Sequence, residues 1–297
     1  MQIHTIDLEF QSRPGLIASF LIESGDRIFL IEPGPGSSRE ILLEKIAALG
    51  HSADAITDVF ITHAHLDHAG CGGWWAQNGA TLHVHPKAAR HLIDPSKLVD
   101  SAKSVFGEAF DSLWGEMLPA PEDRVHILEP GATVAIGDVT VEAIDTPGHC
   151  FHHHAYAIGD ALFAGDIAGA RLPGSGYISV TSAPPQFHLE SYLDSIDRIM
   201  GRSFSTLYLT HFGEVSDVGD HLANYRAEVV GAARMVKSLI DDGNDPESIQ
   251  VAYQAFQMEQ AFKAELPRAM WDDYQIANNT DMCADGLRLY WEREASA

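Results

Sequence analysis

Cysteine, basic residues and long apolar runs are all scarce in this sequence. The three cysteines, Cys71, Cys150 and Cys283, are odd in number and far apart, which argues against a disulfide framework. No apolar run approaches the roughly 18 residues of a transmembrane helix. The first residues, MQIHTIDLEF, lack the basic and apolar regions of a secretory signal. We therefore expect a cytoplasmic protein that has no membrane partner.

Positive charge is also low. The chain carries 19 Lys and Arg against 42 Asp and Glu, a formal net charge of −23, and no Lys/Arg cluster interrupts this excess. Such a surface repels phosphate backbones, so we do not expect nucleic acid as a main partner. We expect a small-molecule substrate. With 297 residues, of which 45% are hydrophobic, the chain is long enough for a sizeable core in one or two domains.

The N-terminal half alternates apolar runs with glycine-containing turns. GLIASFLIE and RIFLIE flank the turn residues SGD, which predicts a β-hairpin. REILLEKIAALG follows, with apolar residues at helical spacing and Gly50 at its end, and this pattern predicts a helix. Residues 86–124 are helical in patches and interrupted by prolines, so we expect an inserted segment there.

The character of the sequence changes near residue 217. From there apolar residues recur at helical spacing, and Asp245 followed by Pro246 predicts the start of a helix. We therefore predict a catalytic domain over residues 1–216 and a C-terminal helical region over residues 217–297. Aromatic residues in that region would also be compatible with a homodimer.

Three histidines and an aspartate crowd into ITHAHLDHAG, directly after the predicted buried strand 55–61. In an extended backbone alternate residues point the same way, so His63, His65 and Asp67 can converge on one point. Imidazole and carboxylate groups are the usual ligands of catalytic transition metals. The alternative, a polar surface run in a chain with 16 histidines, does not explain this spacing.

Three further candidates each end a predicted strand. His149 closes VEAIDTPGH, Asp166 closes ALFAGD, and His211 closes TLYLTH. With His63, His65, Asp67 and His68 they make five histidines and two aspartates. That set is too large for one tetrahedral zinc ion and suits a dinuclear site.

The ordered motifs HxHxDH, TPGH, GD after an apolar strand, and TH at a strand end resemble the metallo-β-lactamase superfamily. The resemblance covers residues 14 to about 212. It implies an α+β fold, the four-layer αβ/βα sandwich of two mixed sheets flanked by helices. The metal ligands that it implies are His63, His65 and His149 for one ion, Asp67, His68 and His211 for the other, and Asp166 as a bridge.

These ligands imply hydrolytic chemistry. Two divalent ions about 3.5–4 Å apart hold a bridging hydroxide that attacks a carbonyl or phosphoryl centre. Asp67 would also orient the nucleophile or carry a proton to the leaving group. Zinc is the default metal for such ligands, and iron or manganese would accept them as well.

Differences between this sequence and some branches of the superfamily make the functions of those branches less suitable for it. The β-lactamases lack a counterpart of Asp166 and are exported, and the nuclease branches add basic arms or long inserts. The bridging aspartate resembles glyoxalase II-like thioesterases and acyl-homoserine lactonases. In the lactonases a loop tyrosine donates a hydrogen bond to the substrate, a role that Tyr177 could take. An ordinary solvent-exposed loop tyrosine is the alternative.

The sequence therefore predicts a dinuclear metal-dependent hydrolase of a small ester, thioester or lactone. A phosphodiesterase with the same metal centre is one alternative, and a metal-binding sensor or scaffold without turnover is another. Of the consecutive histidines His152, His153 and His154, we expect one to support the site and the others to be strand residues.

Overall fold

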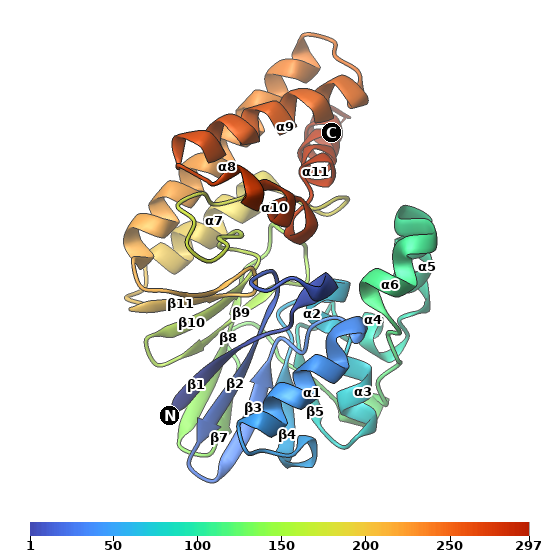
Figure 1. Cartoon of the computed structure of the whole chain (residues 1–297), viewed down its shortest axis with the longest axis vertical. Coiled ribbons are helices and arrows are strands. Elements are labelled where there is room, and N and C mark those ends of the chain that lie inside the picture. Colours follow the sequence, from blue (N-terminus) through green and yellow to red (C-terminus); the bar gives the residue numbers. More distant parts are fainter. Residues whose placement is uncertain (297) are drawn as a thin grey trace. The chain divides into compact units, whose positions relative to one another are not determined.

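A computed structural model gives the fold of the chain and describes residues 1–296 (Figure 1). The chain separates into two compact units. Unit 1 comprises Met1–Asp145 and His152–Gly165, and unit 2 comprises Thr146–Phe151 and Asp166–Ala297. The division that the sequence suggests after residue 216 stays a prediction.

Unit 1 contains ten strands in two sets. The first set forms a mixed sheet in the order β1 (Gln2–Asp7), β2 (Ala18–Ser24), β3 (Arg27–Ile31), β4 (Ile56–Phe60), β5 (Thr81–Val84) and β6 (Val125–Ile127). Strands β1 to β3 are antiparallel, whereas β3 to β6 are parallel. The second set is antiparallel, in the order β7 (Thr133–Ile136), β8 (Val139–Asp145), β9 (His154–Ile158) and β10 (Ala161–Gly165).

The hairpin and the helix that the sequence predicts in unit 1 are both confirmed. The predicted hairpin is β2 and β3, whose strands pair from Phe20 with Ile31 to Ser24 with Arg27. The predicted helix is α1 (Arg39–Ala48). The other helices of unit 1 are α2 (Leu66–Ala69), α3 (Gly72–Gln77), α4 (Ala89–Ile93), α5 (Ser96–Phe106) and α6 (Phe110–Trp114).

Aromatic side chains join the two sets of strands in unit 1. The rings of Phe20 in β2 and Phe163 in β10 lie 5.3 Å apart, edge to face. The buried Tyr156 of β9 packs against Phe60 of β4. Its hydroxyl lies 3.0 Å from the carbonyl oxygen of Ile61, which satisfies the polar group inside the core.

The parallel strands of unit 1 end in polar residues at one edge of the sheet. Glu32 follows β3, Thr62 and His63 follow β4 closely, and His85 follows β5. The carboxyl ends of parallel strands are the usual place for ligands in open α/β sheets, because the backbone there leaves the sheet in loops. This edge therefore positions chemistry-bearing side chains on a rigid frame.

Unit 2 is mainly helical. Its elements are α7 (Leu189–Met200), β11 (Thr206–Leu209), β12 (Gly213–Val215), α8 (Val218–Asp241), α9 (Pro246–Lys263), α10 (Trp271–Ala277) and α11 (Thr280–Ser296). The long helices α8, α9 and α11 pack on one another (Figure 1). As predicted, Asp245 caps α9, since its carboxylate accepts a hydrogen bond of 2.8 Å from the Ser248 amide. Among the described residues, no helix has both the length and the hydropathy that crossing a bilayer demands.

Candidate metal centre

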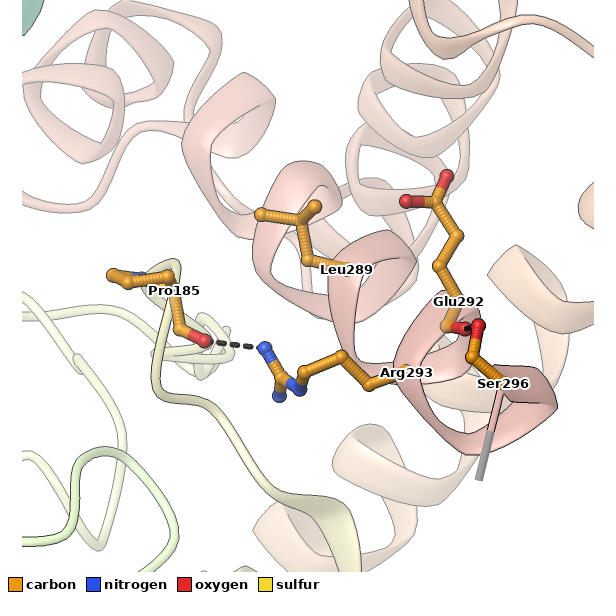
Figure 2. A pocket seen from close by; sticks show the side chains of 5 residues that line it. All are labelled: Pro185, Leu289, Glu292, Arg293 and Ser296. Atoms are coloured by element: carbon orange, nitrogen blue, oxygen red, sulfur yellow. Dashed lines mark hydrogen bonds between the residues drawn. The ribbon is translucent and has the colours of Figure 1, made fainter.

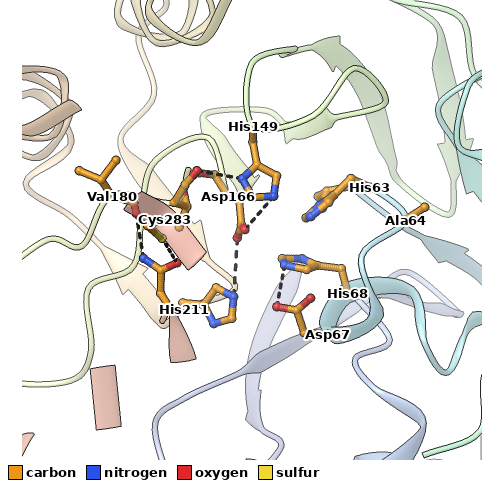
Figure 3. A network of polar contacts seen from close by, with 12 residues as sticks. His63, Ala64, Asp67, His68, His149, Asp166, Val180, His211 and Cys283 are labelled. Atoms are coloured by element: carbon orange, nitrogen blue, oxygen red, sulfur yellow. Dashed lines mark hydrogen bonds and ion pairs between the residues drawn. The ribbon is translucent and has the colours of Figure 1, made fainter. Parts of the chain in front are cut away.

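Four of the predicted ligands lie together in unit 1, in the loop after β4. The ring of His63 lies 4.4 Å from that of His65 and 4.0 Å from that of His68. The carboxylate of Asp67 lies 3.4 Å from Nε2 of His68 (Figure 3). The single helical turn α2 follows His65 and contains Asp67 and His68. Because a helical turn is compact, it keeps these two side chains close to His63 and His65.

Glu32 holds this loop from the end of the neighbouring strand β3. Its side chain is buried, and it accepts a hydrogen bond of 2.7 Å from the Thr62 amide and a second one from Nδ1 of His68. A buried carboxylate needs such donors, because an unpaired charge in the interior is costly. Glu32 is not among the site residues that the sequence predicts. An acidic residue directly after the apolar run RIFLI was the available signal.

Replacing Glu32 by glutamine is expected to weaken metal binding by about 10- to 100-fold, the usual cost of losing a partner that orients a ligand. The neutral amide cannot accept from both the Thr62 amide and the His68 ring, so one donor is left without an acceptor. Metal affinity of the purified variant, measured by competition with a chromogenic chelator, checks this.

Glu23→Gln is the matched control, since Glu23 also contacts two histidines, His4 and His51, outside the predicted ligand set. It should bind metal with unchanged affinity. Equal affinities of the Glu32 and Glu23 variants would contradict the role given to Glu32.

The other three predicted ligands lie together in unit 2. Oδ2 of Asp166 is 3.3 Å from Nε2 of His149, and Oδ1 of the same carboxylate is 3.7 Å from Nε2 of His211 (Figure 3). All three side chains are buried. One carboxylate thus presents each of its two oxygens to a different imidazole, which is the arrangement that a bridging ligand requires.

A network of hydroxyl and carbonyl groups holds Asp166 and His149 in position. The hydroxyls of Thr181 and Tyr192 each lie 2.6 Å from the main-chain oxygen of Asp166, to which they can donate. The carbonyl oxygen of Thr181 is 2.9 Å from Nδ1 of His149. The hydroxyl of Tyr225 joins the network, since it lies 3.1 Å from the Thr181 hydroxyl and 2.6 Å from the Tyr192 hydroxyl. Burial raises the pKa of Tyr192 and Tyr225 well above the ordinary value of 10, so both remain neutral donors.

Three imidazoles of the predicted set have Nδ1 against a protein oxygen. The oxygens belong to the Glu32 carboxylate for His68, the Thr62 hydroxyl for His63 and the Thr181 carbonyl for His149. Since a carboxylate and a carbonyl can only accept, they hold the ring protons of His68 and His149 on Nδ1 and leave the Nε2 lone pairs available as ligands. In tautomer, burial and donor type, the residues present fit divalent metal ions.

Tyr177 lies in the described part of unit 2, but it is not an exposed loop residue. Its side chain is 2% exposed, and its hydroxyl donates a hydrogen bond of 2.6 Å to Oε1 of Gln257. The alternative of a solvent-exposed tyrosine is therefore wrong. Its donation to a substrate stays a prediction, and it requires the hydroxyl to exchange Gln257 for the substrate.

A pocket of about 440 Å³ opens on the surface of unit 2, lined by Pro185, Leu289, Glu292, Arg293 and Ser296 (Figure 2). The Arg293 guanidinium donates to the main-chain oxygens of Pro185 and Phe187. Its hydrogen-bonding capacity is thus partly used within the fold. The lining contains none of the predicted site residues, so we do not assign the pocket to the candidate site.

Comparison with known proteins identifies relatives. The model of the metallo-β-lactamase superfamily matches residues 12–211. The chain is 28% identical over 167 residues to the metallo-β-lactamase fold-containing protein ST1585 of Sulfurisphaera tokodaii, covering 55% of this chain and 63% of the relative. It is 30% identical over 144 residues to a hydroxyacylglutathione hydrolase of Hyphomonas neptunium, covering 46% and 45%.

A third relative is the atrochrysone carboxyl ACP thioesterase AacuM of Aspergillus aculeatus, 23% identical over 214 residues, which are 71% of this chain and 55% of the relative. The chain thus spans about half to two-thirds of the length of these curated relatives.

Solved structures agree in fold. A metallo-β-lactamase family protein of Thermus thermophilus, TTHA1429, has a TM-score of 0.69 at 17% identity, covering 99% of this chain and 94% of its own. The structure of ST1585 has a TM-score of 0.64 at 24% identity, covering 76% and 85%. The predicted α+β fold with C-terminal helices is therefore confirmed. Because the family model spans more than half of the sequence and the fold agrees, the chain belongs to the metallo-β-lactamase superfamily, a superfamily of hydrolases.

Proposed function

We propose that this chain is a dinuclear metal-dependent hydrolase of small carbonyl esters, with thioesters as the preferred class. The observation that carries the proposal is Asp166, whose two carboxylate oxygens face His149 and His211 separately. Such a carboxylate suits a pair of ions better than a single one. The seven predicted ligands would hold two divalent cations, zinc by default.

When bound, a pair of such cations lowers the pKa of water and stabilises negative charge on the attacked oxygen. The residues of the chain supply the rest. The Glu32 carboxylate and the Thr181 carbonyl hold the ring protons of His68 and His149 on Nδ1, and Glu32 and Thr181 also keep the loops in place. Asp67, whose side chain is 19% exposed, is the carboxylate to which we assign proton transfer to the leaving group.

The choice of thioesters is supported by the relatives. One is named a hydroxyacylglutathione hydrolase and another an ACP thioesterase, and both names describe hydrolysis of a thioester. The net charge of −23 disfavours polyanionic phosphodiesters, because an acidic surface repels them. The same argument favours acyl groups on a neutral or weakly charged thiol carrier.

A substrate panel tests the function. We expect the zinc-loaded chain to cleave model thioesters, such as S-acyl pantetheine, faster than aryl esters or lactones, and to leave phosphodiesters intact. Removal of the metal with a chelator should abolish turnover, and returning zinc should restore it. Thiol release measured with a thiol-reactive dye reports the reaction.

Two outcomes would contradict the proposal. Full activity of a metal-free preparation would remove the metal dependence, and cleavage of phosphodiesters alone would give the reaction to the phosphoryl centre. Binding of zinc by the seven predicted ligands without turnover of any ester would support a metal-binding sensor instead.

A further inference from the structure

Three side chains of unit 1 that carry potential ligand atoms lie outside the predicted ligand set and meet at the edge of its sheets. His85 follows β5 in the first sheet. Asp145 ends β8 and His154 begins β9, and these two residues are register partners of the antiparallel pair. The first sheet and the β7–β10 set thus each contribute to one cluster.

The distances within this cluster suit a single metal ion. Nε2 of His85 lies 3.4 Å from Oδ1 of Asp145, and the rings of His85 and His154 lie 4.5 Å apart. One ligand atom from each residue can be chosen so that all three lie within 4.8 Å of one another. Zinc–ligand bonds of about 2.0–2.2 Å place two tetrahedral ligand atoms about 3.4 Å apart, as His85 and Asp145 already are.

His154 supplies independent evidence for a ligand. Its side chain is 0% exposed, and within residues 1–296 neither of its ring nitrogens has a hydrogen-bond partner. Buried polar groups are seldom left in that state, because losing water without a replacement partner is costly. Burial, with a smaller contribution from the nearby His85, lowers the pKa of His154 to about 3, so the ring stays in the neutral form that binds metals.

We propose that His85, Asp145 and His154 bind a divalent transition-metal ion at a site separate from the seven predicted ligands. Two imidazoles and a carboxylate are a ligand set for zinc, with a water molecule as the fourth ligand. The Asp145 side chain is 33% exposed, which gives the ion and that water a path from solvent. Because β5 belongs to one sheet and β8 and β9 to the other set of strands, the ion acts as a clamp between them in unit 1.

A change of tautomer accompanies binding. The Lys87 amide donates a hydrogen bond of 3.0 Å to Nδ1 of His85, so the neutral ring carries its proton on Nε2. Coordination through Nε2 requires this proton to move to Nδ1 and the Lys87 hydrogen bond to break. The site therefore binds zinc more weakly than a preformed site would. The move of the proton to Nδ1 of His85 can be followed by nitrogen NMR.

The test uses the full chain and zinc alone. Zinc bound per chain, measured after equilibrium dialysis at micromolar zinc, should fall by one equivalent in Asp145→Asn. It should stay unchanged in Asp26→Asn, a control that removes a similar charge from an exposed hairpin turn. His154→Phe, which fills the space without a ligand nitrogen, should lose the same equivalent. Equal stoichiometry in wild type and Asp145→Asn would overturn the proposal.

Nitrogen NMR of the ¹⁵N-histidine-labelled wild type gives a second readout that does not depend on any variant. Saturation with zinc should move the proton of His85 from Nε2 to Nδ1 and shift one ring nitrogen of His154. Unchanged ring nitrogens of both residues at zinc saturation would also overturn the proposal. Neither readout depends on hydrolytic activity, so the clamp and the proposed reaction fail separately.

Discussion

Replacement of Asp166 by asparagine is expected to lower kcat/KM for a model thioester by more than about 100-fold, beyond the cost of losing a residue that only orients a ligand. The carboxylate gives one oxygen to the side of His149, at 3.3 Å, and the other to the side of His211, at 3.7 Å. Asparagine keeps the shape but replaces one oxygen by an NH₂ group, which donates hydrogen bonds and does not bind cations.

The metal content should fall together with the rate. A bridging carboxylate neutralises charge between two cations, so its loss raises their mutual repulsion and releases at least one of them. Steady-state kinetics with added zinc and metal analysis after dialysis measure the two effects separately.

Asp194→Asn is the matched control, because Asp194 is an exposed aspartate of helix α7 in the same unit. It should retain full activity and metal content. If Asp166→Asn kept the full zinc content of the wild type and near-native kcat/KM, the carboxylate would not bridge, and the dinuclear proposal would lose the observation that carries it.

Local patterns in the sequence predict the elements that carry the site. The apolar run before His63 forms β4, and the hairpin β2–β3 and the helix α1 follow their turn and spacing signals. These predictions succeed because hydrophobic periodicity and turn chemistry act over a few residues. The family motifs then supply the order of the ligands, which no local pattern could have assigned to separate ions.

The supporting residues could not be predicted in this way, because their roles depend on contacts between distant segments. Glu32 contacts His68 only because β3 pairs in parallel with β4. Thr181 supports His149 from a loop 32 residues further along the chain. An isolated glutamate or threonine has no spacing that distinguishes it from its neighbours. The burial of Tyr177 likewise follows from its contacts with Gln257 and Tyr274, which lie about 80 or more residues away.

Alanine in place of Gly148 is expected to destabilise the chain by about 2–6 kcal/mol, the sum of backbone strain and overpacking. Gly148 precedes His149 and has a φ of +137°, which residues with a Cβ rarely adopt. An added Cβ would overlap the backbone nitrogen and Cα of Tyr192 in helix α7. The free energy of unfolding from denaturant titration measures the effect.

Gly174→Ala separates the two causes. Gly174 also has a positive φ, +75°, but an added Cβ would meet nothing within 4 Å, so this variant should lose only about 1 kcal/mol from strain. The difference between the variants then measures the overlap with α7. The Gly148 main-chain oxygen also accepts a hydrogen bond of 2.8 Å from the His188 amide, which holds the loop against the start of that helix. A Gly148 variant as stable as the Gly174 variant would mean that α7 can move away. In that case the TPGH loop, and with it His149, would be less rigidly held than a metal ligand requires.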